Sequence, residues 1–121
     1  FTKVAENRGI EFTFVDLTNQ AAAKAAFKSN TRLVWMETPT NPLLKVIDIR
    51  KTAAMAHAHG ALIAVDNTFM SPYFQRPLEL GADIVMHSMT KFLNGHSDVV
   101  AGALVAGPSL PVKRGGRSSN S

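Results

Sequence analysis

Residues 33–66 read LVWMETPTNPLLKVIDIRKTAAMAHAHGALIAVD, and this stretch decides the fold class. The apolar runs at 33–36 and 62–65 have the length of buried strands. The segment between them is compatible with a helix, because Asp48 is a favoured N-cap and Gly60 stands where a helix C-terminus favours a left-handed residue. The stretch therefore predicts a strand–helix–strand unit, the building block of a parallel sheet.

The same alternation continues on both sides of this unit. Apolar runs at 12–15, 84–86 and 101–105 predict further strands, and residues 19–28, which contain five alanines, predict a second helix. The two prolines within residues 71–77 favour irregular chain with short helical pieces. We expect an α/β fold with a mostly parallel sheet and flanking helices.

Composition excludes several classes of protein. Of the 121 residues, 45% are hydrophobic and 18% are charged, which is typical of a globular domain. The net charge of +4 depends on Lys113, Arg114 and Arg117, because without them ten basic residues face nine acidic ones, so we expect no nucleic-acid partner. There is no cysteine, no signal peptide and no apolar run near the roughly 20 residues that span a bilayer, so we expect no membrane partner and a cytoplasmic location.

The character of the sequence changes at residue 108. The final stretch, PSLPVKRGGRSSNS, is rich in Pro, Gly, Ser and basic residues and has no hydrophobic period. We predict a partial α/β domain at 1–107 and a disordered tail at 108–121. Since the chain begins at Phe1 and closes on GGRSSNS, we expect it to be an internal piece of a longer protein.

Polar side chains follow three of the predicted strands, at the point where each strand ends. Ligands of open α/β sheets bind beyond the carboxyl ends of the strands, so these side chains are expected to converge on one crevice. The set holds acids, amides, hydroxyls and an amine: Glu37, Asn41, Asp66, Asn67, Thr68, Ser88, Thr90 and Lys91.

Four of these residues match the needs of pyridoxal 5'-phosphate (PLP). This cofactor requires an amine that forms a Schiff base and a carboxylate that keeps the pyridine nitrogen protonated, with hydroxyl donors for its phosphate. Lys91 supplies the amine and Asp66 the carboxylate, while Ser88 and Thr90 supply hydroxyls. Taken alone, such a lysine is usually a surface residue, and an aspartate that ends a strand is usually a turn residue.

Two longer segments outweigh that interpretation. VWMETPTNP (34–42) and AVDNTFMSPYFQRPLELGADIVMHSMTKFLNGHSDVVAG (64–102), with 25 residues from Asp66 to Lys91, resemble the Cys/Met-metabolism family of PLP-dependent enzymes. The resemblance implies the large domain of the aspartate-aminotransferase type (fold type I). It implies that Lys91 carries the cofactor and acts as acid and base, and that Asp66 binds the pyridinium nitrogen. The other cofactor contacts that it implies are the phosphate-binding hydroxyls of Ser88 and Thr90, the amide of Asn41 at the ring hydroxyl, and Thr68 close to the ring.

The resemblance also implies a reaction. Such a lyase of trans-sulfuration would eliminate a thiol from the γ carbon of cystathionine, giving cysteine, 2-oxobutanoate and ammonia. Its partners would be a small-molecule sulfur amino acid and further copies of the chain, in a homotetramer whose subunits share active sites. γ-Synthesis, β-elimination and γ-elimination from methionine use the same lysine and aspartate and stay open, as do an inactive structural fragment and a small basic binding module.

The histidines do not predict a metal site. His57 and His59 are two positions apart on a predicted helix and point to different sides, so they cannot chelate one ion. His87 and His96 have no ligand spacing around them and are expected to pack or to form hydrogen bonds. The sequence holds neither G-x-G-x-x-G nor a P-loop, so dinucleotide and nucleoside triphosphate binding have no support.

Overall fold

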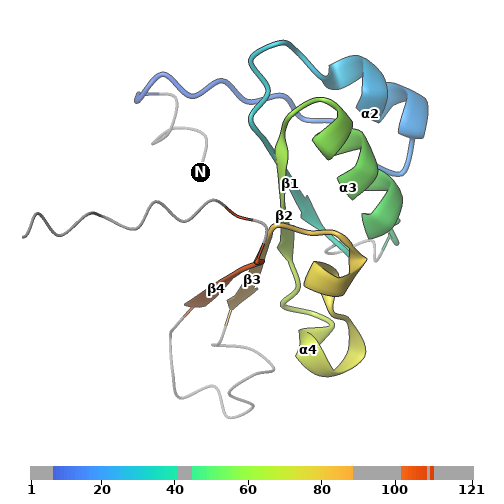
Figure 1. Ribbon diagram of the computed structural model, residues 1–121. Coiled ribbons are helices and arrows are strands. Elements are labelled where there is room, and N and C mark those ends of the chain that lie inside the picture. The colour runs from blue at the N-terminus through green and yellow to red at the C-terminus, as the bar shows by residue number, and fades with distance from the viewer. Residues whose placement is uncertain (1–6, 41–44, 89–101, 109, 111–121) are drawn as a thin grey trace, which may run out of the picture.

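The computed structural model describes residues 7–40, 45–88, 102–108 and 110. Figure 1 shows the helices gathered beside a small twisted sheet. In chain order the elements are α2 (Gln20–Ala26), β1 (Leu33–Glu37), α3 (Ile49–Ala58), β2 (Leu62–Asp66), α4 (Ser71–Phe74), the 3₁₀ helix η1 (Pro77–Leu80), β3 (Ile84–Ser88) and β4 (Gly102–Ala106). Apart from Pro108 and Leu110, the predicted tail lies outside the described residues.

The described sheet has the strand order β1-β2-β3-β4. β1, β2 and β3 run parallel, and β4 pairs with β3 in the antiparallel sense. This confirms the predicted mostly parallel α/β sheet. The register sets Glu37 opposite Asp66 and Asp66 opposite Met86, so the carboxyl ends of the three parallel strands lie at one edge.

Helix α3 forms for the reasons that the sequence indicates. Asp48 is its N-cap, and Oδ1 of Asp48 accepts a hydrogen bond of 3.0 Å from the backbone N–H of Lys51. The helix ends at Ala58, and Gly60 follows with a φ of 71°, a left-handed conformation that glycine adopts at little cost. β2 begins two residues later, as predicted.

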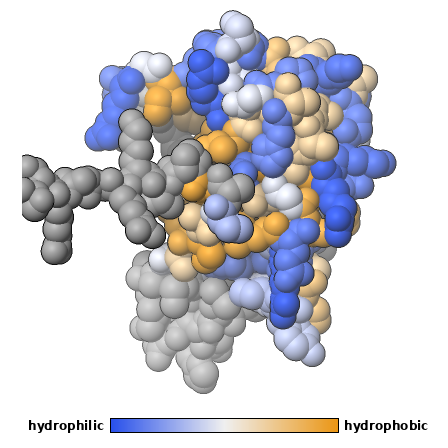
Figure 2. Space-filling model, in the orientation of Figure 1, coloured by the Kyte–Doolittle hydropathy of each residue, from blue (hydrophilic) through white to orange (hydrophobic). Residues whose placement is uncertain are grey.

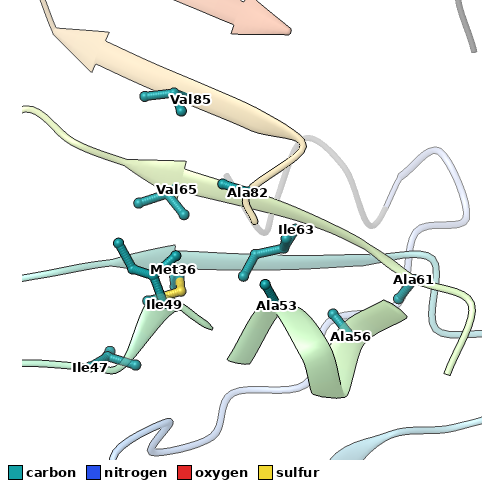
Figure 3. Close-up of a cluster of buried hydrophobic side chains, with 10 residues drawn as sticks. All are labelled: Met36, Ile47, Ile49, Ala53, Ala56, Ala61, Ile63, Val65, Ala82 and Val85. Carbon is teal, nitrogen blue, oxygen red and sulfur yellow. The ribbon is translucent and has the colours of Figure 1, made fainter. Parts of the chain in front are cut away.

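One hydrophobic cluster joins α3 to the sheet. In Figure 3 side chains from the strands and from α3 meet in the space between them, and Ile63 and Val65 of β2 are fully buried. Each such side chain contributes roughly 1.5–3 kcal/mol on burial. The ten buried members are Met36, Ile47, Ile49, Ala53, Ala56, Ala61, Ile63, Val65, Ala82 and Val85.

The prediction of a strand at residues 12–15 is wrong, because residues 10–16 have no strand or helix assignment. A strand requires a hydrogen-bonded ladder, and in the described sheet β1 pairs with β2 alone. Side-chain ion pairs hold this segment instead, from Glu11 to Lys28 and from Asp16 to Lys45. Phe14 is 83% exposed, so the alternating apolar pattern buries little surface.

The face of the sheet opposite α3 carries exposed apolar side chains. Strand alternation places Leu33 and Trp35 of β1, Leu62 of β2 and Leu104 of β4 on this face, and all four are exposed. Figure 2 shows apolar side chains gathered over the centre of the surface in view. Among the described residues, no helix is long and apolar enough to cross a membrane.

Candidate functional site

The ends of β2 and β3 bring three predicted site residues together. Asp66 is the last residue of β2, Thr68 follows it by two positions, and Ser88 is the last residue of β3. The other three predicted site residues, Asn41, Thr90 and Lys91, lie outside the described residues. Asn41 follows β1 in the sequence, and Lys91 follows β3.

Thr68 links the two strand ends through its hydroxyl. Its Oγ1 donates a hydrogen bond of 2.6 Å to Oδ1 of Asp66 and accepts one of 2.9 Å from the backbone N–H of Ser88. The backbone N–H of Thr68 donates to the same Oδ1 at 3.1 Å, which completes an Asx turn. Thr68 therefore fixes the Asp66 carboxylate relative to both strands.

Glu37 lies across from Asp66 on the neighbouring strand. Partial burial raises the pKa of Glu37, and the Asp66 carboxylate raises it further. A pair of carboxylates at one sheet edge favours a cation between or beside them, and a protonated pyridine nitrogen is such a group.

His87 precedes Ser88 and points away from solvent. It is 5% exposed, and its Nδ1 has no hydrogen-bond partner within the described part of the chain. Burial lowers the pKa of His87, while the charge of Asp66 acts in the opposite direction. Burial has the larger effect, so the pKa of His87 lies below its ordinary value.

Asn67, one of the predicted strand-end residues, and Gln75, which the sequence analysis did not single out, hold the adjacent chain. Asn67 is fully buried, and its side chain exchanges two hydrogen bonds with Gln75. Gln75 also donates to the backbone carbonyl of Thr38, just after β1. The sequence carries one hint of this, since Asn67 is a polar residue that directly follows a buried strand.

His57 on α3 contacts a carboxylate outside this helix. Its Nε2 lies 2.8 Å from Oδ2 of Asp83, and the same oxygen accepts a hydrogen bond from the backbone N–H of Ile63. The Asp83 side chain is 6% exposed, so this contact joins α3 to the starts of β2 and β3. Within the residues that the structure describes, no three candidate ligands meet in a metal site.

A cleft of about 340 Å³ opens along β1, away from the ends of β2 and β3 that hold Asp66, Thr68 and Ser88. Trp35, Glu37 and Thr40 line it together with the ion pair of Asp16 and Lys45, whose charged atoms lie 3.4 Å apart. Asp66, Thr68 and Ser88 do not line it. We therefore place the candidate site at the strand ends and not in this cleft.

The strand-end residues fit PLP. Oδ1 of Asp66 is engaged by Thr68, whereas Oδ2 accepts no hydrogen bond from the described residues and is available to a pyridinium N–H. Ser88 uses its backbone N–H to bind Thr68, which leaves its hydroxyl for a phosphate oxygen. The donors and acceptors at this edge are therefore of the types that the cofactor requires.

Comparison with known proteins identifies the family of this chain. The family described as Cys/Met metabolism PLP-dependent enzyme matches residues 1–115. Cystathionine gamma-lyase from Dictyostelium discoideum is 64% identical over 104 residues, 86% of this chain and 27% of that enzyme. Cystathionine beta-lyase from Lactococcus lactis subsp. cremoris is 59% identical over 100 residues, 83% of this chain and 26% of that enzyme.

A solved structure gives the same result for the fold. Crystalline cystathionine gamma-lyase from Lactobacillus plantarum, in complex with L-serine, superposes with a TM-score of 0.85 at 48% identity, covering 87% of this chain and 28% of that one. The chain thus spans about a quarter of the length of these relatives. With the family match and the strand-end site together, the chain belongs to the Cys/Met metabolism PLP-dependent enzymes, whose cofactor is pyridoxal 5'-phosphate.

Proposed function

We propose that the protein carrying this chain is a carbon–sulfur lyase that cleaves cystathionine at its γ carbon. The observation that carries the proposal is the Asp66–Thr68–Ser88 linkage, because it presents a fixed carboxylate oxygen at the edge where PLP chemistry requires one. The similarity to a relative named cystathionine gamma-lyase supports this substrate. The reaction consumes cystathionine and water and releases cysteine, 2-oxobutanoate and ammonia.

Each site residue has a role that follows from the chemistry of its side chain. Lys91 holds the cofactor through Nζ, and this amine then moves protons between the carbon atoms of the substrate. Asp66 binds the ring N–H and keeps that nitrogen protonated, while Thr68 holds the carboxylate in place. Ser88 and Thr90 bind the phosphate, and Asn41 binds the ring hydroxyl. When bound, the cofactor supplies an electron sink that lets a carbanion form next to the amino group.

The bond changes at the substrate follow from this arrangement. Loss of protons from the α and β carbons lets the bond between the γ carbon and sulfur break, and the sulfur leaves as the thiol of cysteine. Lys91 Nζ is the group that carries these protons. Water then supplies the keto oxygen as ammonia is released, so atoms and charge balance without an added oxidant or reductant.

The attachment of the cofactor can be tested directly. The protein is mixed with PLP and reduced with borohydride, and the labelled lysine is located by peptide mass spectrometry. We expect label on Lys91, loss of label in Lys91→Ala, and unchanged label in Lys24→Ala, an exposed lysine of α2. Label scattered over surface lysines would contradict the proposed site.

Product analysis separates the alternative reactions. From cystathionine, γ-elimination gives cysteine and 2-oxobutanoate, whereas β-elimination gives homocysteine and pyruvate. γ-Synthesis requires cysteine and an activated homoserine ester, and methionine γ-elimination releases methanethiol. The β-lyase alternative has support of its own from a relative of that name at 59% identity.

Two alternatives of another class remain testable. An inactive structural fragment would show neither Lys91 labelling nor turnover of any of these substrates. A basic binding module that used Lys113, Arg114 and Arg117 would bind nucleic acid with a steep salt dependence. We expect no binding of a fluorescent duplex at physiological salt, measured by anisotropy.

The remaining partners follow from the proposed reaction. We propose a homotetramer whose subunits share active sites, acting in the cytoplasm on a small sulfur amino acid. Light scattering on the purified protein would give the number of subunits, and a monomeric mass with full activity would refute shared sites.

A further inference from the structure

Asn67 anchors the chain between the two site residues Asp66 and Thr68. Its backbone N–H donates to the carbonyl of Met86 at 2.9 Å, which extends the β2–β3 ladder by one residue. Its backbone carbonyl accepts from the N–H of Ser71 at 3.0 Å, and its side chain is fully buried. Asn67 is therefore held from both sides, whereas its two neighbours present their side chains to the site.

Gln75 completes this anchor and extends it to β1. Its Nε2 donates to Oδ1 of Asn67 at 2.8 Å, and its backbone carbonyl accepts from Nδ2 of Asn67 at 2.8 Å. The same Nε2 donates to the carbonyl of Thr38 at 3.1 Å. One side chain thus joins the carboxyl ends of β1 and β2, and it lies 37 residues along the sequence from Thr38.

We propose that Asn67 and Gln75 form a clamp that positions the Asp66–Thr68 pair, so that Gln75 is a positioning residue of the cofactor site. The inference rests on the proposed function for its catalytic consequence. Thr68 lies beyond the last strand residue, and the Asx turn and its bond to Ser88 keep it in place only while the Asn67 backbone is fixed. Loss of the clamp releases the turn without removing any group that touches the cofactor.

Hydrogen exchange on the cofactor-free protein tests the positioning itself. Gln75→Met keeps an unbranched side chain and removes both Nε2 hydrogen bonds, and Gln20→Met makes the same change at the exposed start of α2. We expect the amides of Thr68 and Ser88 to exchange about tenfold faster in Gln75→Met, since two partly buried hydrogen bonds are lost. The amide of Ile63, bound to Asp83 at the other end of β2, should be unchanged and so reports that the sheet is intact.

Two results would overturn the clamp. The first is equal exchange of Thr68 and Ser88 in Gln75→Met, Gln20→Met and the unchanged protein. The second applies if Gln75→Met does not fold: Gln75→Glu keeps the shape but loses the Nε2 donors, and its failure to speed exchange at these two amides would refute the idea.

A double-mutant cycle on the PLP-loaded protein tests the catalytic consequence. We expect Gln75→Met to weaken PLP binding about tenfold by itself and less than about threefold in a Thr68→Val background, because both changes act on the same turn. Equal effects in the two backgrounds would show that Gln75 does not act through Thr68. Absence of PLP from the unchanged protein would refute the proposed function, while the exchange experiment would still decide the clamp.

Discussion

Replacement of Thr68 by valine tests how the carboxylate at the end of β2 is held. Valine has nearly the shape of threonine but no hydroxyl, so it removes the 2.6 Å bond to Asp66 and leaves the N–H of Ser88 without its acceptor. A hydrogen bond to a charged group contributes about 1.5–3 kcal/mol, and an unpaired N–H costs about 1–3 kcal/mol when buried. The low ends of both ranges together give about 2.5 kcal/mol, and because Asp66, Thr68 and Ser88 are each partly exposed we expect a slightly smaller loss of about 2 kcal/mol.

The chain supplies a matched control for this change. Asp16 and Thr18 form the same local motif, in which Oδ1 of Asp16 accepts from the N–H of Thr18 at 2.9 Å and from its hydroxyl at 2.6 Å. The Asp16–Thr18 motif is exposed, and within the described residues the Thr18 hydroxyl accepts no hydrogen bond from a strand. We therefore expect Thr18→Val to cost less than about 0.5 kcal/mol.

Urea unfolding and PLP titration provide the two measurements. We expect Thr68→Val to lower the free energy of unfolding by about 2 kcal/mol and to weaken PLP binding about tenfold. Thr18→Val should change neither quantity. Equal stability and equal affinity in the two variants would refute the role assigned to the Thr68 hydroxyl.

Three further predictions concern pH and packing. The raised pKa of Glu37 means that the native state binds a proton more tightly than the unfolded chain, so the contribution of Glu37 to stability falls as pH rises through its native pKa. In urea titrations, Glu37→Gln should therefore increase the free energy of unfolding more at pH 7 than at pH 4. The lowered pKa of His87 has the opposite sign, so the free energy of unfolding should fall as pH drops from 7 to 5. The change His87→Phe should flatten that slope, and an unchanged slope would contradict the prediction. Ile63→Ala should lower the free energy of unfolding by about 3 kcal/mol in thermal or urea unfolding, because the side chain is fully buried. Leu62→Ala, at the exposed neighbouring position, is the control, and equally small losses in the two variants would contradict the packing in Figure 3.

The sequence predicted best the features that depend on residues close together in the chain. The cap at Asp48 and the left-handed Gly60 set the limits of α3 through contacts within a few residues, and both were predictable. The strands at 33–36 and 62–65 were predictable because continuous apolar runs of that length are typical of strands in a parallel sheet. The run FTFV at 12–15 is also largely apolar but has no ladder partner among the described residues, and composition alone does not reveal whether a partner exists.

For the site, the sequence by itself determined the types of chemical group, their positions at strand ends and the family to which they belong. Only the tertiary structure decided which groups meet. It sets Glu37 opposite Asp66, and it lets the Thr68 hydroxyl form hydrogen bonds with both Asp66 and Ser88. The Asp16–Thr18 motif has the same local hydrogen bonds but does not lie at a strand end. The Gln75 clamp and the His57–Asp83 contact were likewise invisible in the sequence. The physical reason is that a hydrogen bond depends on distances of about 3 Å between atoms that are tens of residues apart, and strand register, not residue type, sets those distances.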